Sequence, residues 1–477
     1  EEDMEKKREV VLGLASRGQV GRAARRISSF GVASLEDPAT MATLRSKYPP
    51  RARPLPPTVT KGQCVDNLGG LKEAMLGLER GVSSGPGGLR NEHLVVLAQV
   101  WNEEELEVYQ EFGLLYLNAG LPPWFYRVWS TVTTVPLYKT DRREADKLRP
   151  VGVAPTMVRL LDKFAAVQNR QVLQAHLEPQ QLALSPAGGH KLVHIVRMSM
   201  EAHPDWVCLK LDVENAHNSV SRASILEAVE EEQSLRHLAQ HYAATSAAPT
   251  ALESGGRVWG EAREALTQGR PGSSGRFCVA WHREVRELDR EVKGGGGGGA
   301  VFGNDDGYIM GPPVIVFPAL ERFAARILSR CSLRLQRAKT EVFCWGELPA
   351  CTPPDLHRAG VEVGGVFEPG MECYGIAIGS DAFVSNYLAS KVEEIKLVVE
   401  RTCSLLENDL QAKWTFLTSS VAHKLSYHQS LQYPSDMRPH AERLDSILWG
   451  MLESATGLHI PRGEEGLGVE CVLGGPV

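Results

Sequence analysis

Two neighbouring carboxylates, Asp305 and Asp306, lie between two apolar runs in the stretch VFGNDDGYIM, residues 301–310. Asn, Asp and Gly tolerate the positive backbone angles of a tight strand-to-strand connection, so the stretch alone favours an ordinary solvated hairpin turn. The alternative is a hairpin whose tip holds metal ions, because carboxylate oxygens are the ligands that Mg²⁺ prefers. Which interpretation holds depends on the rest of the chain.

A third acid, Asp212, ends the short buried-strand pattern WVCLKLDVENA. The end of a strand and the tip of a hairpin can meet on one sheet, which would gather three carboxylates. Such like charges repel and raise one another's pKa unless a divalent cation lies between them. Two Mg²⁺ ions about 4 Å apart can clamp the attacking and leaving oxygens of an in-line phosphoryl displacement. The three acids therefore suggest nucleotidyl transfer.

The elements that would position these acids can be read from apolar spacing. STVTTVPLYKT has the alternation of a strand, and the charged turn DRREADK joins it to LRPVGV, which predicts a basic hairpin. After the hairpin, one apolar helix face is indicated by Val158, Leu161, Ala165 and Val172. Helices are also predicted for SRASILEAVEEE and FCVAWHREVRELDREV, and one hairpin within residues 244–276.

The outer parts of the chain are mainly helical by the same criteria. Short helices in the first sixty residues end in the Pro-rich connection YPPRARPLPPTV, which is typical of a linker. Residues 66–128 are predicted to be mostly helical, and AKTEVFCW and ECYGIAIG to be strands. The run Gly294–Gly299 favours no one conformation and indicates a flexible connector. Within 385–430 one helical stripe is predicted, made of Val392, Ile395, Val399, Leu406, Leu410 and Leu417.

The composition is that of a soluble globular protein, with 477 residues, 43% hydrophobic and 23% charged. No uninterrupted apolar run of membrane-spanning length occurs, and the charged N-terminus has no apolar core behind it. We therefore expect an intracellular protein, nuclear or cytoplasmic, that does not bind membranes. The absence of Met at residue 1 indicates a fragment or a processed product. Nine scattered cysteines, an odd number without zinc-ligand spacing, predict reduced thiols.

The net charge of −6 is unusual for a protein that binds nucleic acid, but its distribution is uneven. Residues 131–200 hold ten basic residues against five acidic ones. Acidic residues gather elsewhere, as in VEEE at 229–232. One basic band on a mildly acidic body is compatible with nucleic acid and equally with a solvated surface.

Several motifs in order resemble the reverse transcriptases of non-LTR (LINE-type) retrotransposons. KLDVENAHNSVSR resembles their first palm motif, and FGNDDG matches the position of their paired-Asp hairpin. SSGPGGLRNEHL is similar to an early Gly-Pro-Asp-Gly segment, VPLYKT with LRPVGVAPTMVRLLDKFAA to the fingers motifs, and QGRPGSS to a Gln-Gly-x-Pro loop. RLQRAKTEVF, CYGIAIG and IPRGEEGLGV resemble the later Lys motif, the Tyr-Leu-Gly strand and the Gly-Leu-Gly segment. The resemblance spans roughly residues 80–470.

This resemblance implies an RNA-directed DNA polymerase with an α+β right-hand fold of fingers, palm and thumb, the palm an antiparallel sheet packed on helices. It divides the chain into an N-terminal helical segment with its linker (1–65), fingers (66–200), palm (201–380) and a helical thumb or connection (381–477). The implied partners are an RNA template, a DNA primer and deoxynucleoside triphosphates (dNTPs).

The resemblance also implies roles for single residues. Two Mg²⁺ ions would be held by Asp212, Asp305, Asp306 and the main-chain carbonyl of Val213. Lys139 and Arg149 would contact the incoming triphosphate, because fixed cations offset charge that grows in the transition state. Lys339 would be the general acid near the leaving pyrophosphate. The template strand would contact Gln268 and Gly269, and the nucleotide sugar would contact His217, where the family usually has Phe or Tyr.

Departures from the family pattern leave a second interpretation open. Gly303 and Asn304 replace the aromatic-Ala pair that normally precedes the two Asp, and Gly87 replaces the Asp of the early motif. A decayed relative that binds RNA or DNA without turnover would tolerate such changes. A third class, a nucleotidyl cyclase with a two-carboxylate palm, predicts neither the Gln-Gly-x-Pro loop nor basic fingers, and the sequence has both.

Overall fold

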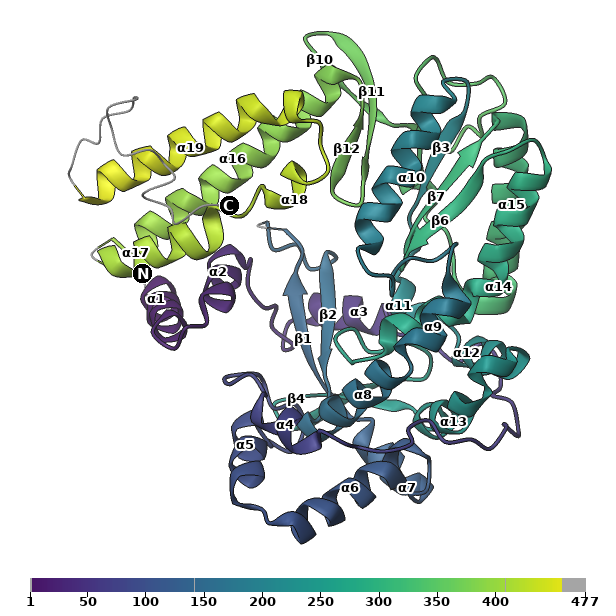
Figure 1. Ribbon diagram of the computed structural model, residues 1–477, viewed down its shortest axis with the longest axis vertical. Coiled ribbons are helices and arrows are strands. Elements are labelled where there is room, and N and C mark those ends of the chain that lie inside the picture. Colours follow the sequence, from purple (N-terminus) through teal and green to yellow (C-terminus); the bar gives the residue numbers. More distant parts are fainter. Residues whose placement is uncertain (1, 141, 408, 457–477) are drawn as a thin grey trace. The chain divides into compact units, whose positions relative to one another are not determined.

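The computed structural model (Figure 1) describes residues 2–140, 142–407 and 409–456. Its helices and small mixed sheets confirm the expected α+β class. The chain forms two compact units, one of Phe30–Arg358 and one that joins Glu1–Ser29 to Ala359–Val477. This division is coarser than the four expected segments, whose boundaries stay a prediction.

The larger unit contains a five-stranded sheet in the order β6-β7-β3-β8-β9. Its strands are β3 (Val207–Leu211), β6 (Gly299–Gly303), β7 (Asp306–Gly311), β8 (Glu341–Phe343) and β9 (His357–Arg358). Pairing is antiparallel from β6 to β8, but β9 runs parallel to β8. The expected antiparallel sheet is therefore present, except at this short edge strand.

Helices lie on both sides of this sheet. Figure 1 shows α10 (Gly188–Ala202) on one side of β3, β6 and β7, with α14 (Ser273–Gly294) and α15 (Pro313–Cys331) on the other. Because side chains alternate along a strand, Leu209 and Leu211 point to one side, where they join α14 and α15 in the main apolar core. Lys210 lies between them and points to the other face, and the same alternation places Asp212 on that face too. The predicted strand at 207–211 and the helix that begins near Phe277 are confirmed.

A second sheet carries the basic hairpin, in the order β2-β1-β4-β5. β1 (Val132–Tyr138) and β2 (Leu148–Val153) pair antiparallel, which confirms the hairpin predicted from sequence. β4 (Thr250–Ser254) and β5 (Arg257–Ala262) form the second predicted hairpin, and β4 runs parallel to β1. Helix α8 (Thr156–Gln168) follows β2 and buries Val158 and Leu161, as the apolar spacing predicted, but Ala165 is only half-buried and Val172 lies on the next helix, so the single predicted face is confirmed only in part.

The remaining elements of the larger unit are short. Its helices are α3 (Pro38–Ser46), α4 (Leu71–Leu76), α5 (Asn91–Val100), α6 (Glu103–Leu117), α7 (Pro123–Trp129), α9 (Arg170–Leu177), α11 (Ala216–Ser219), α12 (Arg222–Glu231), α13 (Ala239–Ala247), and the 3₁₀ turns η1 (Gln233–Leu238) and η2 (Arg337–Lys339). The series α4 to α7 confirms the mostly helical character expected for residues 66–128.

The smaller unit combines helices from both ends of the chain. They are α1 (Glu2–Ala15), α2 (Val20–Ser28), α16 (Asp381–Leu405), α17 (Leu410–Phe416), the π-helical turn η3 (Leu417–Val421), α18 (Ser426–Gln429) and α19 (Pro434–Thr456), with strands β10 (Gly360–Val363), β11 (Val366–Cys373) and β12 (Ile376–Gly379). Val11, Ala23 and Ile27 pack with Leu406 and Phe416. The predicted stripe is buried except at Leu410, which is 49% exposed.

The glycine run is packed closely, which corrects the expectation of a flexible connector. Residues 295–298 make the turn from α14 into β6, and Gly296, Gly297 and Gly298 have positive φ. A Cβ at Gly298 would lie 2.1 Å from the carbonyl oxygen of Met310, and one at Gly295 would lie 2.6 Å from Ile315. Only glycine lets the backbone approach so closely, so the run fixes the start of β6.

Two further expectations concern cysteines and membranes. The eight cysteines in the described part of the chain are all free thiols, as predicted from their spacing. None of the helices in the described ranges is both long and apolar enough to cross a membrane. The segment IPRGEEGLGV, which resembles a Gly-Leu-Gly motif, and Asp141 in the basic hairpin turn lie outside the described residues.

Candidate active site

The first two carboxylates come together through strand register. β3 pairs with β7 so that Leu211, the last residue of β3, faces Gly307. Asp212 directly follows Leu211 and Asp306 directly precedes Gly307, so both acids lie at the same end of this sheet. The end of β3 and the tip of the β6–β7 hairpin are therefore at one sheet end, whereas a shared metal site stays a prediction.

The third carboxylate occupies the hairpin turn itself. Gly303 and Asp306 are the last pair of β6 and β7, so Asn304 and Asp305 form a two-residue turn, and Asn304 has a φ of 70°. The amide Nδ2 of Asn304 donates to Asp305 Oδ1 at 3.1 Å. Asn304 thus has the positive φ that its residue type permits. The interpretation of this stretch as an ordinary hairpin turn is therefore confirmed.

Asp305 lies in the electrostatic environment of two buried groups. Burial raises the pKa of the Cys278 thiol, and the Asp305 carboxylate raises it further. Burial lowers the pKa of His217, and the same carboxylate opposes that shift. Asp305 therefore lies within electrostatic range of Cys278 and of His217, the residue expected beside the nucleotide sugar.

The backbone fits a metal site better than the side chains do. Glu214 N donates to Arg334 O and Gln336 N donates to Asp212 O, both at 2.8 Å, so the carbonyl of Val213 between them points the other way, toward β7. That orientation suits its expected role as a metal ligand. Nevertheless, the described residues contain no group of three His, Cys, Asp or Glu side chains at metal-ligand spacing.

Lys339 is the basic partner of the strand-end acid. It ends η2, and its Nζ lies 3.5 Å from Asp212 Oδ2, with 61% of the lysine side chain and 42% of the aspartate side chain exposed. An exposed pair of this kind contributes only about 0–1 kcal/mol to stability. The ammonium is thus close to the acid without being locked to it.

The basic hairpin contributes two further cations. Arg149 on β2 pairs with Leu137, and Lys139 directly follows β1. Burial lowers the pKa of Lys139, and the cations Lys47, Arg149 and Lys339 lower it further, whereas Asp212 opposes these shifts. These charges, which come from three separate motifs, therefore lie within electrostatic range of Lys139, and Lys339 and Asp212 are also in direct contact.

The expected template loop packs against the hairpin. Gly152 N on β2 donates to Gln268 O at 3.3 Å. Gly269 has a φ of 98°, and a Cβ there would lie 3.4 Å from the Gly152 carbonyl oxygen. The Gln-Gly pair is thus placed by main-chain contacts with β2, and glycine is required by the backbone angle.

His217 is buried rather than open to solvent. Its ring stacks on Phe277 with centroids 4.7 Å apart and planes 5° apart, and 8% of the residue is exposed. Its carbonyl accepts from Leu266 N at 2.7 Å, which links it to the segment before Gln268. The ring is therefore held in place by Phe277, and its contact with a nucleotide sugar stays a prediction.

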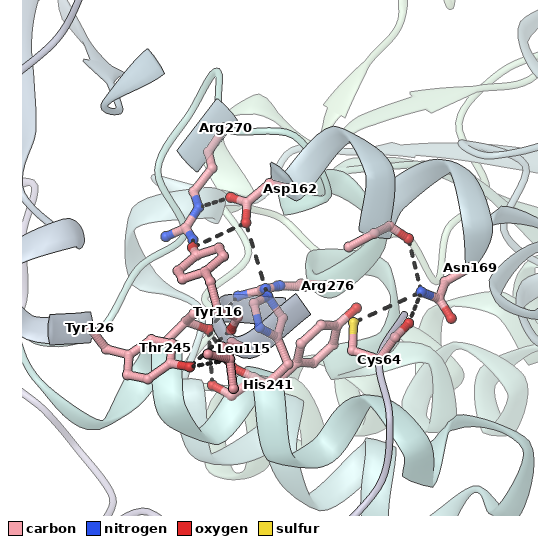
Figure 2. A network of polar contacts seen from close by, with 12 residues as sticks. Cys64, Leu115, Tyr116, Tyr126, Asp162, Asn169, His241, Thr245, Arg270 and Arg276 are labelled. Carbon is pink, nitrogen blue, oxygen red and sulfur yellow. Dashed lines mark hydrogen bonds and ion pairs between the residues drawn. The ribbon is translucent and has the colours of Figure 1, made fainter. Parts of the chain in front are cut away.

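Sequence reasoning missed a buried ionic network behind the site (Figure 2). Asp162 on α8 forms a short hydrogen-bonded ion pair with Arg270, and the Tyr116 hydroxyl donates to the same carboxylate at 3.3 Å. Arg270 Nη2 reaches Tyr116 Oη at 2.9 Å, and His241 Nε2 lies 4.0 Å from Asp162. An acid on the apolar helix RLLDKFAA was the available signal. Arg270 directly follows Gln268 and Gly269, so the network anchors the template loop to α8.

Sequence reasoning also missed Lys47, which lies outside every motif quoted above. It follows α3, and Asn215 Nδ2 donates to its carbonyl oxygen at 2.7 Å. No periodicity or spacing in the sequence points to this lysine.

The arrangement combines acids at the end of a buried sheet with cations from a separate hairpin, a combination suited to binding phosphates beside metal-seeking carboxylates. Comparison with protein-family models and with curated proteins found no match for the chain.

Proposed function

We propose that the chain is the RNA-directed DNA polymerase (reverse transcriptase) domain of a non-LTR retroelement, with a right-hand arrangement of fingers, palm and thumb. The observation that supports it best is the contact of Lys339 with Asp212 within electrostatic range of Lys139, because residues from three scattered motifs of one enzyme class then act on one another. The substrates would be dNTPs, with an RNA template and a DNA primer.

The residues have distinct roles in this proposal. Two Mg²⁺ ions bound by Asp212, Asp305, Asp306 and the Val213 carbonyl would activate the primer hydroxyl and neutralise charge on the phosphates. Lys139 and Arg149 bind the triphosphate, where fixed cations stabilise the transition state. Lys339 holds a proton on Nζ for the leaving pyrophosphate.

The neighbouring residues position template and sugar. Gln268 and Gly269 contact the template strand, and Arg270 keeps their loop against α8. His217 stands where the nucleotide sugar would lie. Because its ring is held flat on Phe277, it leaves more room there than a larger aromatic ring at the same backbone position. We therefore expect weaker exclusion of a ribose 2′-hydroxyl than an aromatic residue at this position gives.

A second candidate is a relative that binds RNA or DNA without turnover. The lack of a three-ligand metal group in the described ranges favours it, as does the replacement of the aromatic-Ala pair by Gly303 and Asn304. Geometry matters here, since about 1 Å of misplacement can cost a hundredfold in rate.

The two candidates are separated by primer extension. The full chain is assayed with an RNA template, a DNA primer, dNTPs and Mg²⁺, beside Asp305→Ala and the exposed control Asp205→Ala. We expect Asp305→Ala to lose at least about a thousandfold in rate, which corresponds to roughly 4 kcal/mol of transition-state stabilisation. The control should keep full activity.

Equal inactivity of all three proteins, together with RNA binding that weakens with salt, would support the non-catalytic relative. Extension that is unaffected by Asp305→Ala would contradict the assignment of the carboxylates.

A further inference from the structure

Lys47 is fixed between the basic hairpin and the end of β3. Leu44 on α3 packs with Leu148 on β2 in one apolar cluster, and Leu148 directly precedes Arg149. On the other side, the Asn215 side chain donates to the Lys47 carbonyl, and Asn215 lies three residues after Asp212. The backbone of Lys47 is therefore held beside both halves of the candidate site.

The segment before α3 is hydrogen-bonded to the basic hairpin. Ala33 N donates to Pro136 O at 2.9 Å and Tyr138 N donates to Gly31 O at 3.3 Å, so residues 31–33 run along β1. Together with the contact between α3 and β2, these bonds attach Lys47 to the element that carries Lys139.

Lys47 and the three cations near it have few ion-pair or hydrogen-bond partners among the described residues. Within the described ranges, the side chains of Lys47, Lys139 and Arg149 have no ion pair or hydrogen bond, and Lys339 has only Asp212. Burial lowers the pKa of Lys47, Asp146 and Glu214 oppose that shift, and Lys339 adds to it. Burial also lowers the pKa of Lys139, and repulsion from Lys47, Arg149 and Lys339 adds to that effect. A bound anion would reduce this repulsion between like charges.

We propose that Lys47 binds the polyphosphate of the incoming nucleotide, alongside Lys139 and Arg149. The identification of the ligand as a nucleotide rests on the proposed polymerase function. The three cations themselves indicate only that the ligand is a polyphosphate. Lysine suits the role because its ammonium is a compact charge with three donors that can reach several phosphate oxygens.

Binding of inorganic tripolyphosphate to the full chain tests the site without catalysis. Isothermal titration calorimetry compares the unmodified chain with Lys47→Gln, Lys47→Arg and Arg45→Gln, a charge loss at an exposed position on α3. We expect Lys47→Gln to weaken binding about tenfold, as loss of one charge-assisted contact should. Lys47→Arg and Arg45→Gln should bind within about twofold of the unmodified chain.

The variant keeps the main-chain hydrogen bond from Asn215, so it should fold, and circular dichroism melting checks this. Unchanged tripolyphosphate affinity in folded Lys47→Gln would overturn the inference, and so would an equal loss in Arg45→Gln. Absence of tripolyphosphate binding by the unmodified chain would overturn it as well.

Primer extension distinguishes this inference from the function on which it rests. If the chain extends a primer, Lys47→Gln should raise the KM for dNTP about tenfold while kcat changes little. If it extends no primer but Lys47→Gln still loses tripolyphosphate, the polymerase proposal fails and the polyphosphate site stands. Extension with an unchanged KM in the variant would leave the polymerase and remove Lys47 from the site.

Discussion

Two carboxylates of the larger unit, Asp162 and Asp212, lie in opposite environments. Asp162 is 3% exposed and is surrounded by Arg270, Tyr116 and His241. Asp212 has 42% of its side chain exposed, and among the described residues its one ion pair is the 3.5 Å contact with Lys339. One acid is fully committed to protein partners, and the other stays accessible to a ligand.

The physical reason is the cost of burying charge. Burial alone would raise the pKa of Asp162, but the adjacent Arg270 guanidinium holds it below its ordinary value. Such a pair is stable only while both partners remain, because a lone buried charge is strongly destabilising. An acid that has to exchange protein partners for metal ions or substrate cannot be held in this way.

The sharpest test of the comparison is to remove each acid in turn. Asp162→Ala should destabilise the larger unit by about 3–5 kcal/mol, because it leaves Arg270 buried without a counter-charge. Asp212→Ala should cost at most about 1 kcal/mol, since it removes only an exposed pair. Amide hydrogen exchange in α8 and α13 measures this unit separately from the other.

Activity should respond in the reverse sense, with Asp212→Ala inactive in primer extension although folded. Arg263→Gln, which removes the exposed partner of Glu261, controls for the loss of a surface ion pair. Similar stability costs for Asp162→Ala and Asp212→Ala would break the comparison.

The buried network also predicts a pH dependence. Burial, reinforced by Arg276, lowers the pKa of His241 from 6.5 to about 3, so the folded state keeps this ring neutral. Stability from this group is present above pH 6.5 and is lost as the pH falls toward 3, at up to about 1.4 kcal/mol per pH unit. Between pH 6.5 and 5 we expect a loss of roughly 2 kcal/mol, measured by urea unfolding.

His241→Phe should flatten this dependence, because the phenylalanine ring cannot take up a proton in the unfolded chain. The exposed His194→Gln is the matched control and should leave the slope as it is. A slope that stays the same in His241→Phe would show that other groups carry the acid sensitivity.

The local elements of the site could be predicted from sequence because each one has a periodic or turn signal. The alternation in residues 132–138, the apolar run at 207–211 and the Asn-Asp turn at 304–305 all became the expected elements. The meeting of the β3 end and the Asn-Asp turn at one sheet end followed from a general property of strands and hairpins. The spacing of the carboxylate side chains did not follow, because it depends on rotamers and on partners such as Lys339 and Asn304.

Contacts over long sequence separations left no such signal. Asp162 and Arg270 are 108 residues apart, and the contact of Lys47 with Asn215 spans 168 residues. The packing of α1 and α2 with the C-terminal helices is of the same kind. The glycine run was misread because six glycines look alike whether they are free or pressed against a neighbouring backbone.

The smallest expected effects concern how that glycine run holds the hairpin of Asp305. Gly298→Ala places a Cβ against Met310 O at a φ of 101°, so it should destabilise the β6–β7 hairpin by more than about 1 kcal/mol. Gly294→Ala, at the last residue of α14 with open space around its Cβ, should instead stabilise by about 0.5–1 kcal/mol. Amide hydrogen exchange in β6 and β7 measures the change in local stability for both substitutions. Stability changes of opposite sign would mean that close backbone contact fixes this hairpin, whereas side-chain charges fix the network around Asp162. If both substitutions were tolerated equally, the glycine run would be flexible, as the sequence suggested.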